Sequence, residues 1–387
     1  MSDGHETPPG WSAEQPPPYR APGSPYSGGP HPSAWQQPVP PQPPYGQQGY
    51  GYVPPPALRP GIIPLRPLGL GDIYDGTIKL IRSNPKAVLG LSAIVAAIAA
   101  VPVSIGQALN LSAIGGSLTN PTADPTALES GAVAQYVPTA ISSVVSLAAV
   151  TILTGILIRI LGRAVFGGKI TAGEAWRLVS ARVPALFGVA FIVIGLLLLP
   201  LIPLVLVVIA VASGGQAGPA VGLGLLFVFA YIAYALVVNT RFAFAAPIVV
   251  LEGLGPVQAM RRSWRLVTGD FWRVFGILLL TTVIASVVSM IISFPFGLIA
   301  GVVSVLSGGS TGATVAVAVV LAIGTTLGAM LTYPLQAGVA GLLYTDRRMR
   351  SEAFDLVLQT AALEQQRQGW VHATADELWH PSNARRP

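Results

Sequence analysis

The sequence contains no cysteine and only four histidines, which lie towards its two ends at His5, His31, His372 and His380. The absence of cysteine excludes disulfide frameworks, cysteine-ligated zinc and thiol chemistry. Neither a His-x-x-x-His spacing nor a Gly-x-x-x-x-Gly-Lys-Ser/Thr loop occurs, so zinc-helix and nucleotide-phosphate sites lack their usual residues. We therefore expect no catalytic residue, no metal site and no cofactor.

Charge is also scarce, since only 10% of the 387 residues are charged and 52% are hydrophobic. A soluble domain carries about 25% charged residues. The apolar residues gather in six runs that reach or exceed the length of a bilayer-spanning helix. These runs lie near 87–109, 138–162, 185–213, 219–247, 274–306 and 313–344. The sequence therefore predicts an all-α integral membrane protein with six transmembrane helices.

Proline is concentrated at one end, where residues 1–64 hold 19 of the 35 prolines. A segment of this composition cannot bury enough apolar surface to fold, so we expect a disordered tail. At the other end, opposite charges four residues apart, Asp346 with Arg350 and Arg348 with Glu352, predict a helix over 346–368. A flexible tail over 369–387 follows. The Pro-rich tail and the 346–368 helix are the two candidate docking sites for a protein partner.

The basic residues settle the orientation that we predict. All 22 lysines and arginines lie on one side of a six-helix arrangement, and the connections 110–137, 214–218 and 307–312 contain none. By the positive-inside rule this side is cytoplasmic, so both termini are expected in the cytoplasm. Because these residues form no separate basic domain, we expect no nucleic-acid partner.

One phrase recurs along the chain. "WRLVSARVPALFG" over 176–188 and "WRLVTGDFWRVFG" over 264–276 share six identical positions, and "IKLIRSNPKAVLG" over 78–90 is a fainter copy. Each copy precedes a pair of apolar runs. Internal repeats of this kind indicate a repeated architecture. Within a membrane domain over 65–345 we predict three direct repeats, each a cytoplasmic amphipathic helix and a transmembrane hairpin, at about 70–162, 170–250 and 256–345.

The recurring phrase has the pattern of an interfacial helix. Its third copy places Val257, Met260, Trp264 and Val267 on one apolar stripe and arginines elsewhere, while Thr171 and Glu174 give the second copy a capping-box spacing. Such a helix lies in the interface plane, where its arginines meet anionic headgroups of the bilayer, the predicted partner. The predicted membrane-interface anchors are Trp176, Arg177, Arg262, Trp264, Arg265, Trp272 and Arg273.

A few polar residues fall inside the apolar runs, and an intramembrane ionisable group is a functional-site hypothesis by default. The candidate intramembrane polar site consists of Asn239, Arg241 and Gln336. Two interpretations of Arg241 stay open. It could pair with Glu252 in a functional site, or its long side chain could simply extend to the interface.

The segment "RFAFAAPIVVLEGLGPVQAMRRSWRLVTGDFWRVFGILLL" over 241–280, with its Leu251, Glu252, Gly255 and Pro256 turn, resembles the membrane domain associated with glycerophosphoryl diester phosphodiesterases. The stretches "LRPLGLGDIYDGTIKLIRSNP" (65–85) and "LLYTDRRMRSEAFDLVLQ" (342–359) resemble a stand-alone bacterial branch of uncharacterised membrane proteins. The resemblance implies a multi-pass protein of the bacterial cell (plasma) membrane. Diester hydrolysis in the full-length enzymes belongs to a separate soluble barrel, for which we find no segment here, so we expect no enzyme activity.

We therefore expect a non-enzymatic polytopic membrane protein of the cell envelope, acting as a scaffold or accessory protein. The alternative is a transporter or lipid-handling protein whose pathway runs between the three repeats. Such a pathway would be a polar cavity lined by residues such as Asn239, Arg241 and Gln336, whereas a scaffold would be a tightly packed bundle.

Overall fold

The computed structural model describes residues 61–119, 126–214, 217–307, 310–368 and 378–380. All of them belong to one of the two units into which contacts divide the chain, Pro55–Pro387. Within these ranges every regular element is a helix, and six helical segments are long and apolar enough to cross a membrane. The prediction of an all-α chain with six candidate membrane-spanning helices is confirmed.

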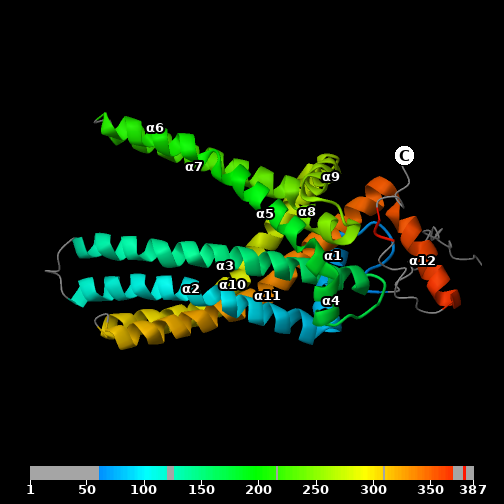
Figure 1. Ribbon diagram of the computed structural model, residues 1–387, viewed down its shortest axis with the longest axis horizontal. Coiled ribbons are helices and arrows are strands. Elements are labelled where there is room, and N and C mark those ends of the chain that lie inside the picture. Colours follow the sequence, from blue (N-terminus) through cyan, green and yellow to red (C-terminus); the bar gives the residue numbers. More distant parts are fainter. Residues whose placement is uncertain (1–60, 120–125, 215–216, 308–309, 369–377, 381–387) are drawn as a thin grey trace, which may run out of the picture. The chain divides into compact units, whose positions relative to one another are not determined.

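Three pairs of long helices follow one another, and a shorter helix precedes each pair (Figure 1). The first group comprises α1 (Leu70–Ser83), α2 (Pro85–Thr119) and α3 (Thr126–Ala164). The second comprises α4 (Ala172–Val179), a short 3₁₀ turn η1 (Ser180–Arg182), α5 (Val183–Leu198), α6 (Leu201–Ser213) and α7 (Ala217–Phe242). The short α8 (Ala245–Pro247) and a π-helical segment η2 (Ile248–Glu252) follow α7. The third comprises α9 (Pro256–Thr268), α10 (Phe271–Leu306) and α11 (Thr311–Glu352), and α12 (Phe354–Gln368) comes last.

Local chemistry explains where several of these helices begin and end. The predicted capping box starts α4, because the Glu174 N–H donates to Thr171 Oγ1 at 3.2 Å and the Thr171 N–H donates to Glu174 Oε2 at 2.8 Å. The break between α5 and α6 falls at Pro200, which has no N–H to continue the helix. The η2 segment ends at Gly253, whose φ of 73° is a left-handed conformation that glycine adopts without steric cost.

The first and third pairs of long helices pack together. Helix α11 packs along both α10 and α2, and α2 packs along α3 (Figure 1). By contrast, α6 makes its main contacts with α7 alone, and Figure 1 shows these two helices diverging from the other pairs. Their exposed side chains are large and apolar, among them Leu206, Ile209, Leu226 and Phe229. A helix that is apolar on all sides is typical of a membrane span, so the exposed surface of α6 and α7 is suited to contact with lipid.

Burial is concentrated at the end of the bundle where the short helices lie. The core there joins residues of 62–80 to the last turns of α3, to η2, to the last turns of α11 and to Phe354 and Trp379. The predicted helix over 346–368 is divided at this end. Helix α11 runs without interruption to Glu352, Ala353 adopts a left-handed φ of 49°, and α12 begins at Phe354.

Candidate functional site

The last turns of α11 carry a run of buried charged residues. The side chains of Asp346 and Arg348 have no exposed surface, and Arg347 is nearly buried. Charged side chains are almost never fully buried unless they are paired, so this run needs partners inside the protein. Those partners come from distant parts of the chain and form two clusters, which we describe in turn.

The Arg348 cluster comprises Glu252, Arg262, Tyr344, Arg348 and Glu352. Arg262 joins both carboxylates, because its Nε lies 2.5 Å from Glu252 Oε2 and its Nη2 donates to Glu352 Oε1 at 2.8 Å. Arg348 Nε donates to Glu352 Oε2 at 2.9 Å and lies 4.0 Å from Glu252 Oε1. The Tyr344 hydroxyl donates to Glu252 Oε1 at 2.5 Å. Two arginines and two glutamates thus balance their charges within one buried group.

The electrostatics of Arg262 follow from this arrangement. Burial by itself lowers the pKa of the Arg262 guanidinium, but contact with Glu252 and the charge of Glu352 outweigh burial and raise the pKa above its ordinary value. Arg262 therefore stays protonated at every physiological pH and keeps its part in the charge balance of the cluster.

A residue near the C-terminus, Trp379, packs against the Arg348 cluster. The buried Trp379 ring lies edge-on to Phe166 at 6.1 Å between centroids, is stacked with Tyr344 at 6.4 Å and is tilted against Phe354 at 5.3 Å. The Trp379 carbonyl accepts a hydrogen bond from Arg348 Nη1 at 3.1 Å. Arg348 also lies over the Phe354 ring at 4.0 Å. Arg348 therefore holds the segment around Trp379 against α3, α11 and α12.

The Asp346 cluster comprises Asp270, Arg273, Asp346, Arg347 and Arg350. Asp346 pairs with Arg273 Nη1 at 2.9 Å and with Arg350 Nε at 2.9 Å. Arg347 Nη1 pairs with Asp270 Oδ2 at 3.1 Å, and Arg347 Nε donates to the Leu266 carbonyl at 3.1 Å. These bonds join the end of α11 to the start of α10 and to the end of α9.

The Asp346 cluster also holds the segment before α1, residues 61–69, which we call the N-terminal strap. The Leu68 N–H donates to Asp346 Oδ1 at 2.7 Å. The Leu68 carbonyl accepts from Arg273 Nη2 at 2.7 Å and from Arg350 Nη2 at 3.0 Å. Further along the strap, Gln359 Nε2 donates to the Leu65 carbonyl at 2.8 Å and the Ile62 N–H donates to the Ala164 carbonyl at 3.2 Å. The strap is thus bonded to α3, α10, α11 and α12.

The structure divides the predicted interface anchors into two groups. Arg262 and Arg273 are engaged in the ion pairs just described. The other five side chains are exposed: Trp176, Arg177, Trp264, Arg265 and Trp272. Trp272, with 79% of its surface exposed, is the most accessible of the three tryptophans.

The predicted intramembrane polar site is also divided. Asn239 and Gln336 line one groove of about 450 Å³ between α7, α10 and α11, together with Thr240, Thr281 and Thr282. Arg241 is not among the residues lining this groove.

Arg241 instead bonds to the end of α9. Its Nη1 donates to Thr268 Oγ1 at 2.7 Å, and its guanidinium lies 4.6 Å from the Trp264 ring centre and 4.9 Å from that of Phe271. The carboxylate of Glu252, which the sequence left open as a partner of Arg241, is occupied by Arg262 and Tyr344.

Sequence reasoning found part of the two clusters and missed the rest. The pairs Asp346 with Arg350 and Arg348 with Glu352 occur as predicted. Their long-range partners Glu252, Leu68 and Trp379 were missed, because no local pattern links positions so far apart. The available signal was a run of charges placed directly after the apolar run 313–344, since such charges must be either solvated or paired. Among the described residues, no group of three or more His, Asp or Glu side chains is placed to hold a metal.

Comparison with known proteins places part of this site in a family. Residues 220–362 match the family model of the membrane domain of glycerophosphoryl diester phosphodiesterase. The match covers η2, α9, α10, α11 and most of α7 and α12, and hence every member of the two clusters. No match was found among curated proteins, and none among solved structures. The predicted resemblance to the membrane domain associated with glycerophosphoryl diester phosphodiesterases is therefore confirmed over residues 220–362.

Proposed function

We propose that this protein is a non-catalytic membrane scaffold whose cytoplasmic end holds both terminal segments of the chain in fixed positions. The observation that carries the proposal is the pair of buried residues Asp346 and Arg348, two positions apart on α11. Asp346 bonds to the N-terminal strap and Arg348 bonds to the segment around Trp379. We infer that these buried ion pairs favour one fixed arrangement, because breaking either pair would leave an uncompensated buried charge.

The proposed topology places this end at the cytoplasmic face of a bacterial cell membrane. The three groups of helices act as structural repeats, with α1, α4 and α9 lying in the interface before each hairpin. Two observations support this. The lysines and arginines all lie on one side of the six-helix arrangement, as the positive-inside rule requires. In addition, α9 buries Ala259, Leu266 and Val267 against the bundle and exposes Trp264 and Arg265.

The geometry supports a scaffold better than a transport pathway. Arg241, the one charged member of the predicted pathway, is stacked on α9 and does not line the groove that contains Asn239 and Gln336. The clustered charges at the end of α11 are paired with one another and bonded to the strap and Trp379, so they already have partners within the protein.

In this proposal the Pro-rich tail and α12 bind a protein partner. The tail directly precedes the strap in the sequence, and the strap is bonded to α12 because Gln359 Nε2 donates to the Leu65 carbonyl. Both predicted docking segments therefore adjoin the strap.

The proposal is tested by measuring whether a partner stays bound when the strap loses its ion-paired carboxylate at Asp346, or when the tail itself is replaced. Full-length protein, the Asp346→Asn variant and a variant with residues 1–60 replaced by a Gly/Ser sequence of equal length would be extracted from cells in native lipid discs. Asp75→Asn, which removes a carboxylate from an exposed ion pair with Lys79, is the matched control. We expect a partner at fixed stoichiometry with wild type and control, and its loss with the other two variants.

Absence of any stoichiometric partner in the wild type would contradict the scaffold. Purified protein in liposomes should also show neither solute uptake nor glycerophosphodiester hydrolysis above empty vesicles. Uptake that the Asn239→Ala and Gln336→Ala variants abolish would support the transport alternative instead.

A further inference from the structure

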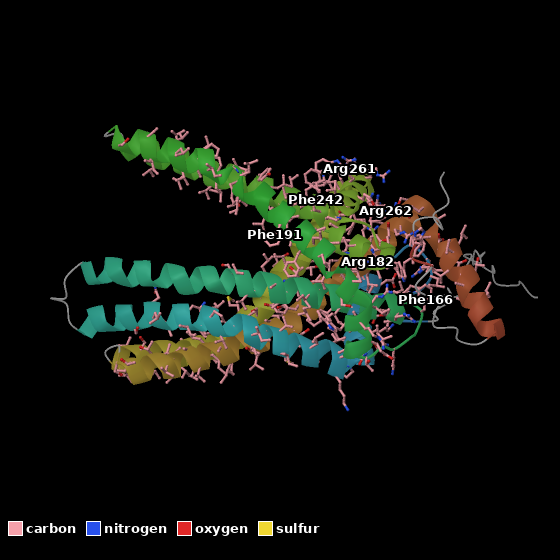
Figure 2. The ribbon with its side chains drawn as sticks, viewed as in Figure 1. Phe166, Arg182, Phe191, Phe242, Arg261 and Arg262 are labelled. Carbon is pink, nitrogen blue, oxygen red and sulfur yellow. The ribbon has the colours of Figure 1, made fainter. Side chains whose placement is uncertain are left out.

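We propose that the groove between α5, the end of α7 and α9 binds one anionic phospholipid, with its phosphate at Arg261 and Arg265 and an acyl chain along the groove floor. The inference rests on the proposed position of α9 at the cytoplasmic interface. It names the class of lipid that this helix binds and the groove in which the lipid lies. Figure 2 labels Arg261 and Phe242 on the side of the molecule where these helices meet.

The orientation of α9 is fixed by bonds on its inner face. Ser263 is fully buried, its hydroxyl donates to the Arg241 carbonyl at 2.8 Å, and it accepts from the Phe244 N–H at 3.2 Å. Met260 and Val267 are buried on the same side. With one face held in this way, the opposite flank is presented outward.

That outward flank combines positive charge with apolar surface. Val257, Arg261, Trp264 and Arg265 are exposed, and their spacing of four, seven and eight residues places them on one side of a helix. No ion pair joins Arg261 or Arg265 to a carboxylate of the described residues, although their neighbour Arg262 contacts two. Because Arg261 and Arg265 have no carboxylate partner among the described residues, the charge of this flank is available to an external anion.

The groove beside this flank has the size and the lining of a lipid site. Its volume is about 750 Å³, and it is lined by Ile192, Phe242, Val257, Met260, Trp264 and the two arginines. Apart from Arg261 and Arg265 the lining is apolar, and Phe191 beside it exposes 62% of its surface. A soluble phosphate could use the arginines but would leave this apolar floor uncovered.

Arg241 adds a third positive group in contact with Trp264, one of the lining residues. Its guanidinium is stacked on Trp264 at 4.6 Å from the ring centre, and its Nε is buried with no hydrogen-bond partner. Guanidinium groups bind phosphate oxygens through paired N–H donors, so Arg261 and Arg265 four residues apart can share one phosphodiester while Arg241 adds to the local positive potential. An anionic phospholipid meets both requirements, because it brings a phosphodiester and an acyl chain together.

The test measures lipid retained by the full-length protein. Native mass spectrometry would count anionic and zwitterionic phospholipids bound after release from mixed-lipid discs, for wild type and for Arg261→Gln/Arg265→Gln. Arg82→Gln/Lys86→Gln is the matched control, since it removes two exposed charges from the same side of the protein. We expect the first double variant to lose about 30-fold in affinity for anionic phospholipid, since each arginine near the surface contributes about a factor of five. The control should change less than about twofold.

A second variant separates a lipid from a free anion. Val257→Trp fills the groove floor and leaves both arginines in place, so it should weaken phospholipid binding and leave binding of inorganic phosphate unchanged. Equal loss in the Arg82→Gln/Lys86→Gln control, or a retained lipid that inorganic phosphate displaces, would overturn the inference. Absence of bound anionic lipid in the wild type would overturn it as well. Partner retention, measured on the same variants, shows separately whether the scaffold proposal stands.

Discussion

The carboxylate of Asp346 accepts a hydrogen bond from the backbone N–H of Leu68 at 2.7 Å, across 278 positions of sequence. The two arginines that neutralise Asp346, Arg273 and Arg350, also donate to the Leu68 carbonyl. Leu68 of the N-terminal strap is thus held both through its N–H and through its carbonyl. The strap is fixed to the bundle by charge-assisted bonds, which are the stronger class of hydrogen bond.

The Asp346→Asn variant should be markedly less stable than the wild type. The substitution leaves Arg273 and Arg350 without their common carboxylate, and removing one partner of a buried ion pair costs about 3 kcal/mol or more. The free energy of unfolding, measured by denaturant titration in detergent micelles, checks this. Asp75→Asn removes an exposed carboxylate and should change the same quantity by about 0.5 kcal/mol or less. Equal values for the two variants would count against a structural role of the Asp346 cluster.

The Trp379→Ala variant should release the C-terminal segment. Trp379 is 1% exposed, and removing a buried aromatic side chain costs about 3–5 kcal/mol. We expect faster cleavage by protease between Gln368 and Trp379 and a lower melting temperature. Trp272→Ala, at a site that is 79% exposed, is the matched substitution and should leave the cleavage rate unchanged. A Trp379→Ala variant that is cleaved no faster than wild type would show that Arg348 and the aromatic rings do not hold this segment.

The charges of the Arg348 cluster should be strongly coupled. Glu252→Gln leaves two arginines facing one carboxylate, whereas Glu252→Gln/Arg262→Gln restores the balance, so the double variant should cost less than the sum of the singles. Contacting residues of one network show coupling energies of about 1–3 kcal/mol. The exposed pair Asp75 and Lys79, at 2.7 Å, should show about 0.3–0.5 kcal/mol in the same cycle. Additive effects at Glu252 and Arg262 would be incompatible with the ion pair.

The stability that this cluster contributes should not depend on the protonation of Arg262 at working pH. The pKa of Arg262 is raised in the folded protein, so its contribution is fully present below the unfolded pKa. That contribution is lost only as the pH rises through the folded pKa. Denaturant titrations of wild type and Arg262→Gln between pH 6 and pH 9 should therefore differ by a constant amount. A difference that shrinks as the pH rises towards 9 would contradict the raised pKa.

The Gly253→Ala variant should be destabilised by strain. Gly253 has φ 73°, which costs a residue with a Cβ about 1–2 kcal/mol, and a Cβ there would lie 2.7 Å from Arg182 Nη2. Arg182 Nη1 donates to the Gly253 carbonyl at 2.7 Å, so the clash also disturbs this bond. Gly173→Ala in α4 is the control. No atom lies within 4 Å of a Cβ built at Gly173, and alanine stabilises a helix relative to glycine. Gly173→Ala should therefore raise the melting temperature and Gly253→Ala should lower it.

The sequence was sufficient for features that depend on neighbouring residues. The six apolar runs, the capping box of Thr171 and Glu174 and the pairs four residues apart at the end of α11 are all present in the structure. Each of these depends on spacing within a few turns of helix. Hydropathy and charge spacing indicate such local features directly, because these features do not depend on how distant segments pack.

The long-range contacts around the end of α11 could not be predicted in this way. Helices in lipid are not sorted by hydrophobicity, because the lipid tails are as apolar as the side chains, so hydropathy does not say which faces meet. The stacking of Arg241 on Trp264, the pairing of Glu252 with Arg262 and the burial of Trp379 all depend on that three-dimensional packing. The same reason explains why Asn239 and Gln336 share a groove and Arg241 does not.

The measurement that tests the central claim most directly is amide hydrogen exchange of the N-terminal strap in the full-length protein. If Asp346 holds the Leu68 N–H, peptides covering residues 61–69 should exchange slowly in the wild type and in Asp75→Asn. The same peptides should exchange rapidly in Asp346→Ala, which removes the acceptor of the Leu68 N–H, while the α10 and α11 peptides stay protected. Exchange of residues 61–69 within seconds in the wild type, or equal protection in the Asp346→Ala variant, would contradict the claim that α11 anchors the terminal segments.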